Sequence, residues 1–165
     1  MSRAWLDLGT NLQREQSLRA AVAALARHVQ VIRSSPVYES APVGFLDQPD
    51  FWNVCLEIET ELSALELRTL LRQLEEELGR VRTENKYGPR NIDMDLVLHE
   101  HEVGEKLPHP QVESQLFVLQ PLCDLVPGHL HPSHQRPLWE LLSELRQRRP
   151  EEKLRPVAVK GFPLG

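Results

Sequence analysis

Two aspartates that stand one residue apart, Asp93 and Asp95, have the clearest chemical potential in this chain. They lie in Ile92–Leu98, a stretch whose other residues are apolar and which we expect to be a strand. Side chains in a strand alternate between faces, so both carboxylates would point one way and the apolar residues the other. Mg²⁺ takes one or two carboxylates together with substrate phosphates. The pair therefore indicates a magnesium site, although two solubilising acids on a strand edge would give the same pattern.

The polar loop before this strand carries a second kind of functional group, the guanidinium. It holds Arg80, Arg82 and Arg90, and Gly88-Pro89 allows the chain to turn sharply. Planar, forked donors suit phosphate oxygens and stabilise negative charge that develops in a reaction. Carboxylates for a metal beside arginines for phosphate are the groups that phosphoryl transfer needs. Together they favour a nucleotide-using transferase over an ordinary surface loop.

The bulk composition restricts the partners. The chain has 165 residues, a net charge of −5, 41% hydrophobic residues and two cysteines. An acidic chain is not expected to bind nucleic acid in general, and two cysteines make no disulfide framework. We find no apolar segment typical of a signal peptide or a membrane span. We expect one domain over residues 1–165, in the cytoplasm, with no membrane partner and a buried Cys55.

The elements that must position these groups follow from hydrophobic periodicity and turn residues. Ser63 and Glu66 form a capping-box pattern, and Gly79 closes the helix that follows. We expect strands at 4–8 (ended by a turn at 9–11), 29–40 (interrupted at Pro36), 51–60, 92–98 and 154–159, and helices at 13–27, 64–78 and 138–146. The first six elements have the order βαββαβ. This order predicts an α+β, ferredoxin-like sandwich, in which helices cover the faces of an antiparallel sheet.

Four stretches resemble one known family, in its order and spacing. They are Gly79–Asp95, Leu8–Leu12, Asp47–Asn53 and Leu107–Pro110. They resemble the 6-hydroxymethyl-7,8-dihydropterin pyrophosphokinases of folate biosynthesis, and the likeness runs from residue 4 to about 145. The resemblance implies that the acceptor's hydroxymethyl oxygen attacks the β-phosphorus of ATP and that AMP leaves. It implies small-molecule substrates, ATP and a pterin, and we expect a monomer.

The resemblance also implies a role for individual residues. Two Mg²⁺ ions would be bound by Asp93 and Asp95. The catalytic residues would be Arg80, Arg90, Asp93 and Asp95. The ATP-binding residues would be Glu75, Arg82, Lys86, Tyr87 and His109, although a solvated helix acid is an alternative reading of Glu75. The pterin-binding residues would be Ser40, Pro42, Val43, Phe51, Asn53 and Phe117.

The pterin residues also have a physical rationale. A flat heterocycle requires aromatic faces above and below it and an amide that reads its edge. Phe51 and Phe117 match the family's stacking positions, although both could equally be core residues. Asn53 lies two residues after Phe51, on the same strand face, where an asparagine lowers stability unless it has partners. Asn53 is therefore the residue expected to read the edge.

Some residues depart from the family's pattern. Gln111 and Gln115 stand where the family commonly has basic residues, Lys86 where arginine is frequent, and Tyr87 where tryptophan is usual. A neutral contact is about half as strong as a charge-assisted one. An alternative reading is therefore a non-catalytic relative that binds a pterin or a nucleotide. A third is another magnesium-dependent nucleotidyltransferase, which would release pyrophosphate instead of AMP.

Five histidines near the C-terminal half raise a further possibility, a transition-metal site. They are His99, His101, His129, His131 and His134. We do not expect such a site, because the sequence offers no cysteine and no clear carboxylate partner to complete the ligand set.

Overall fold

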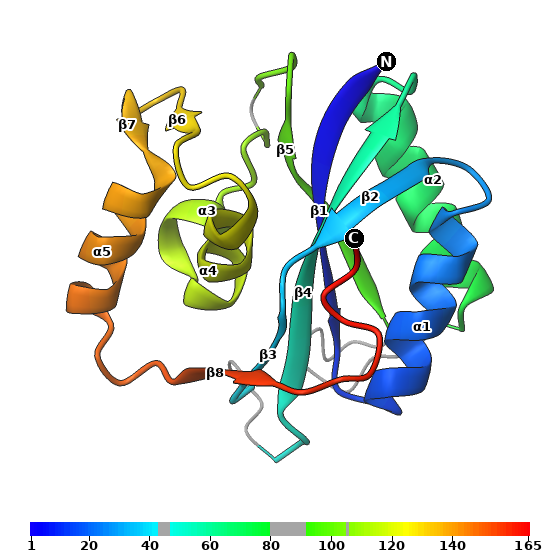
Figure 1. The fold of residues 1–165 in the computed structure, drawn as a ribbon, viewed down its shortest axis with the longest axis horizontal. Coiled ribbons are helices and arrows are strands. Elements are labelled where there is room, and N and C mark those ends of the chain that lie inside the picture. The colour runs from blue at the N-terminus through cyan, green and yellow to red at the C-terminus, as the bar shows by residue number, and fades with distance from the viewer. Residues whose placement is uncertain (43–46, 80–91, 105) are drawn as a thin grey trace.

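An antiparallel sheet forms the middle layer of the structure, with helices on both sides (Figure 1). The computed structural model describes residues 1–42, 47–79, 92–104 and 106–165. In this part of the chain the strand order is β5-β1-β4-β3-β8, and β2 also pairs with β4. The strands are β1 Ser2–Thr10, β2 Gln30–Ser34, β3 Val37–Ser40, β4 Phe51–Thr60, β5 Asp93–His99 and β8 Leu154–Val157.

Strands β2 and β3 are two parts of one interrupted strand, because both pair with β4. The interruption lies at Ser35-Pro36, as predicted, since proline has no amide hydrogen for the ladder. Counted as one strand, they complete a βαββαβ order with β1, β4, β5 and the two helices α1 and α2. The predicted ferredoxin-like α+β fold is confirmed. Strand β8 pairs with β3 and extends the sheet, as expected for the segment after residue 153.

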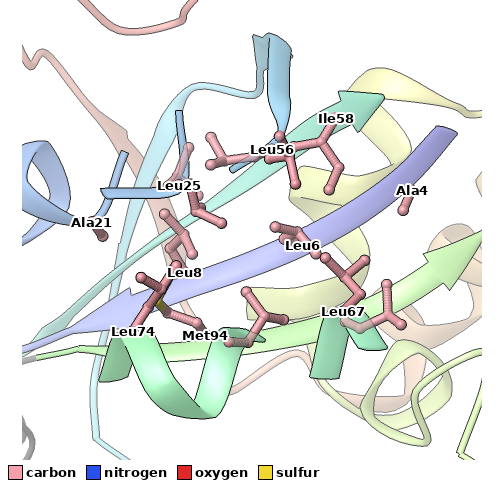
Figure 2. Packing of buried hydrophobic residues seen from close by; sticks show 14 of the residues in the cluster. Ala4, Leu6, Leu8, Ala21, Leu25, Leu56, Ile58, Leu67, Leu74 and Met94 are labelled. Carbon is pink, nitrogen blue, oxygen red and sulfur yellow. The ribbon is translucent and has the colours of Figure 1, made fainter. Parts of the chain in front are cut away.

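Helices α1 (Arg14–Leu25) and α2 (Ala64–Glu77) cover one face of the sheet. Alternate strand residues, such as Leu6, Leu8 and Met94, point into the core between the sheet and these helices (Figure 2). The predicted capping box starts α2, where Ser63 Oγ accepts from the Glu66 N–H at 3.1 Å and Glu66 Oε1 accepts from the Ser63 N–H at 2.9 Å. Two backbone donors at the helix start are thereby satisfied.

The opposite face carries α3 (Gln111–Ser114), α4 (Leu116–Leu125) and α5 (Leu138–Arg148), with a small hairpin of β6 (Leu130–His131) and β7 (Arg136–Pro137). Trp5, Cys55 and Val97 pack there against leucines of α4 and α5. The predicted burial of Cys55 is confirmed, because the middle of the sheet is covered on both faces. None of the helices in the described ranges has the length and apolar character that crossing a bilayer requires.

A buried carboxylate, Glu57 of β4, joins three segments on this second face. Its side chain is 1% exposed. Glu57 Oε1 accepts from the Trp5 indole N–H at 2.9 Å and from Arg33 Nη2 at 3.1 Å, and Oε2 accepts from Arg3 Nη1 at 2.9 Å. A buried carboxylate is tolerated when its oxygens are bonded and its charge is paired. Glu57 therefore fastens β1 and β2 to β4 beyond the ladder itself.

The first strand is longer than predicted, and this extension shapes the site described below. The turn expected at residues 9–11 begins later, because Gly9 and Thr10 still pair with Asn53 and Trp52 of β4. On the other side Gly9 pairs with Asp93 of β5. The added residues therefore place Gly9 between the predicted pterin-reading amide and the first of the two aspartates.

Candidate functional site

Three carboxylates lie on the sheet face opposite α1 and α2. Asp93 and Asp95 are half-buried and alternate with Met94, which points into the α1/α2 core, so the two aspartates share a face as predicted. The third carboxylate, Asp7, belongs to β1, and its backbone lies directly opposite that of Asp95. Like charges directly opposite each other in an antiparallel pair are destabilising. Three acids gathered here favour a cation as their partner.

Asp7 is the most buried of the three and was missed in the sequence. It is 6% exposed, and its Oδ2 accepts from Asn53 Nδ2 at 3.1 Å. Its Oδ1 is buried with no hydrogen-bond partner among the described residues. Burial raises the pKa of the Asp7 carboxyl well above its usual range, Asp95 and Asp93 raise it further, and the Asn53 hydrogen bond opposes the change. An acid at a strand position flanked by Leu6 and Leu8 was the available sequence signal.

Asn53 is held from two sides. Asp7 accepts from its amide nitrogen, and Gly9, its partner on β1, lies beneath that amide. A Cβ atom on Gly9 would stand 2.7 Å from Asn53 Nδ2, closer than real Cβ contacts. Glycine at residue 9 therefore leaves the space that the Asn53 side chain occupies. The buried asparagine has the partner that its position on a strand requires.

Glu75 is a buried positioning residue, so its reading as a solvated helix acid is wrong. It is 1% exposed, and its Oε2 accepts from the Met94 N–H at 2.7 Å. Met94 stands between the two aspartates, so Glu75 fixes the backbone that carries them. Its Oε1 accepts from Arg72 Nη1 at 2.7 Å, and Arg72 Nη2 lies 3.8 Å from Asp95 Oδ1. The predicted contact between Glu75 and ATP stays a prediction.

His109 is held beside β5, the edge strand that carries Asp93 and Asp95. Its backbone N–H donates to the Val97 carbonyl at 2.9 Å, and its Nδ1 accepts from the Gln111 N–H at 3.1 Å. The neutral ring therefore carries its proton on Nε2, which is a donor suited to a phosphate oxygen. Burial lowers the pKa of His109, and the positive charges of Arg68, Arg72 and Lys106 lower it further.

These three cations form a basic group that the sequence reading missed. Arg68 Nη2 donates to the Lys106 carbonyl at 3.2 Å, and Arg72 follows Arg68 by one turn of α2. The spacing of four residues on one helix face was the signal in the sequence. The neutral Gln111 and Gln115 lie in and directly after α3.

Three of the predicted pterin residues within the described ranges, Ser40, Pro42 and Phe51, lie at the end of the sheet where β4 begins. Ser40 is buried at the end of β3 and pairs with Phe51, the first residue of β4. Phe117 is half-buried on α4 and packs against the α4/α5 core, as a core aromatic would. Pro42 is buried two residues after Ser40. Outside the described residues lie the predicted site residues Val43, Arg80, Arg82, Lys86, Tyr87 and Arg90.

The histidine reading needs one correction, because the fold supplies the carboxylate that the sequence did not reveal. Glu113 Oε1 lies 2.6 Å from His134 Nε2 and 3.3 Å from His131 Nε2, and the ligand atoms of the three residues could surround a cation. However, His131 Nδ1 accepts from the Ser133 N–H at 3.2 Å. The neutral ring then carries its proton on Nε2, facing Glu113, so the group is satisfied by its own hydrogen bonds.

This histidine group predicts a pH dependence of stability. Burial lowers the pKa of His131, Glu113 opposes the change, and His134 and His129 add to it. The unfolded chain therefore binds a proton at this residue more readily, and stability is lost as pH falls through about 6.5. His131→Asn keeps an acceptor for Ser133 but cannot titrate. As the pH is lowered from 7.5 to 5.5, we expect the melting temperature of the wild type to decrease more than that of His131→Asn. A difference independent of pH would contradict the assignment.

Comparisons with known proteins agree on one family. The family described as 7,8-dihydro-6-hydroxymethylpterin-pyrophosphokinase matches residues 5–127. A 2-amino-4-hydroxy-6-hydroxymethyldihydropteridine pyrophosphokinase from Bacillus subtilis is 44% identical over 129 residues, which cover 74% of this chain and 77% of that protein. The enzyme of the same name from Aquifex aeolicus is 34% identical over 161 residues, covering 94% and 96%.

A solved structure gives the same fold. The wild-type HPPK-DHPS of Plasmodium falciparum superposes with a TM-score of 0.71 over 91% of this chain, at 14% identity. The chain spans 46% of the length of that protein. At this identity the likeness supports the fold alone.

Proposed function

Because the chain belongs to the 7,8-dihydro-6-hydroxymethylpterin-pyrophosphokinase family, we propose that the carboxylate face of its sheet is the active site. The protein transfers the pyrophosphoryl group of ATP to 6-hydroxymethyl-7,8-dihydropterin in folate biosynthesis. We place the active site here because Asp7, Asp93, Asp95 and Asn53 lie together on one face of the sheet. Acids and a buried, oriented amide in one place suit a reaction that joins a magnesium nucleotide to a heterocycle.

The reaction joins two substrates at one phosphorus atom. The acceptor's hydroxymethyl oxygen forms a bond to the β-phosphorus, the bond from that phosphorus to the bridging oxygen breaks, and AMP leaves with the bridging oxygen. The hydroxyl proton is released. The site's contribution is to hold the two substrates in line and to neutralise their charge. Exclusion of water matters as well, because water is a competing acceptor.

We assign the magnesium to Asp93 and Asp95, with two ions expected. The donor set fits this metal, since Mg²⁺ prefers oxygen ligands and binds through one or two carboxylates plus phosphates. When bound, it would neutralise phosphate charge and help to orient ATP. Glu75 supports this role through its bond to the Met94 N–H, which fixes the peptide between the two ligands. Hydrogen bonds from residues around a metal site orient the carboxylates that bind the metal.

The ATP phosphates are assigned to the basic residues next to this metal site. His109 offers an Nε2–H, and Arg68, Arg72 and Lys106 surround it with positive charge. In the segment outside the described residues we propose that Arg80 and Arg90 act on the reacting phosphates. Arg82, Lys86 and Tyr87 are proposed to bind ATP.

The pterin is assigned to the end of the sheet beside β3 and β4. Asn53 reads the edge of the ring, and Phe51 and Phe117 stack against its faces. Ser40, Pro42 and Val43 form the adjoining wall. Support comes from the position of Ser40 opposite Phe51 and from the held amide of Asn53.

We propose a monomeric domain over residues 1–165 that works in the cytoplasm without nucleic acid or membrane partners. The match to the Aquifex aeolicus enzyme covers 94% of this chain and 96% of that enzyme, which supports the single domain. Sedimentation at working concentration tests the monomer.

Identification of the product tests the function directly. Purified protein with ATP, Mg²⁺ and 6-hydroxymethyl-7,8-dihydropterin is expected to release one AMP per pterin consumed and to require all three components. Release of pyrophosphate instead would indicate a nucleotidyltransferase. Tight pterin binding by folded protein without AMP formation would indicate a non-catalytic relative.

A further inference from the structure

We propose that Asp7 is a positioning residue that orients the Asn53 amide for the pterin. This inference rests on the proposed function, because it assumes that Asn53 reads the edge of the substrate. It concerns a side chain that the family resemblance did not single out and that lies on a different strand from the amide.

The contact between Asp7 and Asn53 is local in space but distant in sequence. Asn53 Nδ2, on β4, donates to Asp7 Oδ2, on β1, at 3.1 Å. The two residues are 46 positions apart in the sequence. The amide reaches Asp7 across Gly9, where a Cβ atom would approach Nδ2 to 2.7 Å. Gly9 therefore leaves the space that the Asn53 amide occupies, and the hydrogen bond to Asp7 fixes the orientation of that amide.

Asp7 Oδ2 accepts from the amide nitrogen of Asn53, so this hydrogen bond fixes which end of the amide faces β1. With Nδ2 turned toward Asp7, the Asn53 oxygen is left for an N–H donor on the ligand. A pterin carries such donors, a ring N–H and an amino group, along one edge. Without Asp7 the amide could rotate and present its nitrogen, which would leave donor facing donor.

The location of Asp7 would be unfavourable without a function. The acid is buried, its Oδ1 has no partner among the described residues, and its backbone lies opposite Asp95. A buried polar atom without a partner is rare in folded proteins and lowers stability. An apolar residue of β1 would pack here, as Trp5 does on the same face.

A direct role in metal binding is the main competing explanation, and burial argues against it. Asp7 is 6% exposed, whereas the Asp95 side chain is 29% exposed. Mg²⁺ keeps several water ligands and shares phosphate oxygens, so its protein ligands must reach solvent. Asp95 meets this requirement and the buried Oδ1 of Asp7 does not.

Two substitutions at Asp7 separate these roles. Asp7→Asn keeps an oxygen that accepts from Asn53 Nδ2, whereas Asp7→Ala removes it. The measurements are the KM for the pterin, kcat, and the Kd of the pterin with saturating α,β-methylene-ATP and Mg²⁺. The Kd of the magnesium complex of that analogue is measured separately. We expect Asp7→Ala to weaken pterin binding about tenfold and Asp7→Asn to stay within about threefold, with nucleotide binding unchanged in both.

Each other outcome has a defined meaning. Equal pterin binding by Asp7→Ala and the wild type overturns the proposal, and so does an equal loss in both variants. Weaker binding of the magnesium nucleotide with unchanged pterin binding would make Asp7 a metal ligand instead. If the alanine variant does not fold, Asp7→Val, which fills the space without an acceptor, takes its place. Wild-type protein that fails to bind the pterin at all would contradict the proposed function.

Discussion

Replacing Asp95 by asparagine is expected to lower the rate of AMP formation by about 10³-fold or more in a protein that remains folded. Asparagine has nearly the same shape but lacks the charge that holds Mg²⁺ against the phosphates. The Asp95 side chain is 29% exposed on the edge strand β5, so we expect the fold to tolerate the loss of its charge. Calorimetry should show weaker binding of Mg²⁺ with the nucleotide, and circular dichroism should show an unchanged fold.

Glu59→Gln provides a matched control for this variant. Glu59 also lies on the sheet, its side chain is 30% exposed, and it pairs with Arg3 at 3.4 Å. Its partner on β1, Arg3, lies four residues before Asp7, which is opposite Asp95, so Glu59 is roughly 14 Å along the strands from this carboxylate pair. Glu59→Gln removes the same charge and should leave the rate unchanged. An active Asp95→Asn enzyme would remove the metal assignment, and an equal loss in both variants would point to net charge instead.

Replacing Glu57 by alanine is expected to destabilise the fold by about 3 kcal/mol. The variant leaves the buried Trp5 indole N–H without its acceptor and releases Arg3 and Arg33. Both arginines are about half-exposed and can turn to water, so most of the loss comes from the indole and the space left behind. In a domain of this size the melting temperature should fall by roughly 6–12 °C.

Two neighbouring variants test whether the buried acceptor is the cause. Glu57→Gln keeps a side-chain oxygen for Trp5 and should recover about half of the lost stability. Glu59→Ala removes a partly exposed partner of Arg3 from the same strand face and should change stability by less than about 1 kcal/mol. Similar melting temperatures for Glu57→Ala and Glu59→Ala would show that burial of Glu57 contributes nothing.

Local pattern was sufficient for the order of the first six elements, βαββαβ, and for the face that Asp93, Met94 and Asp95 occupy, whereas α3, α4 and the hairpin of β6 and β7 were not predicted. Alternation placed Asp93 and Asp95 together and Met94 in the opposite core, because a strand repeats every two residues. The Ser63–Glu66 capping box fixed the start of α2, since its bonds join residues three apart. The family resemblance rested on the same local stretches and is confirmed by the family match.

The length of β1 was misjudged for a physical reason. Gly9, Thr10 and Asn11 have the composition of a turn, but the ladders to β4 and β5 continue through Gly9. Tertiary pairing outweighed local preference, as it often does in strands. This difference affects the candidate site, because the extended strand places Gly9 beneath Asn53.

The sequence by itself determined the fold class, the paired aspartates and the family. The tertiary structure alone decided which distant residues support them. Asp7 meets Asn53 across 46 residues, Glu75 binds the amide of Met94 across 19, and Glu113 meets His134 across 21. Periodicity tells which face a side chain occupies but not which strand or helix lies beside it. That choice depends on strand order, register and packing, which long-range contacts set when the chain folds.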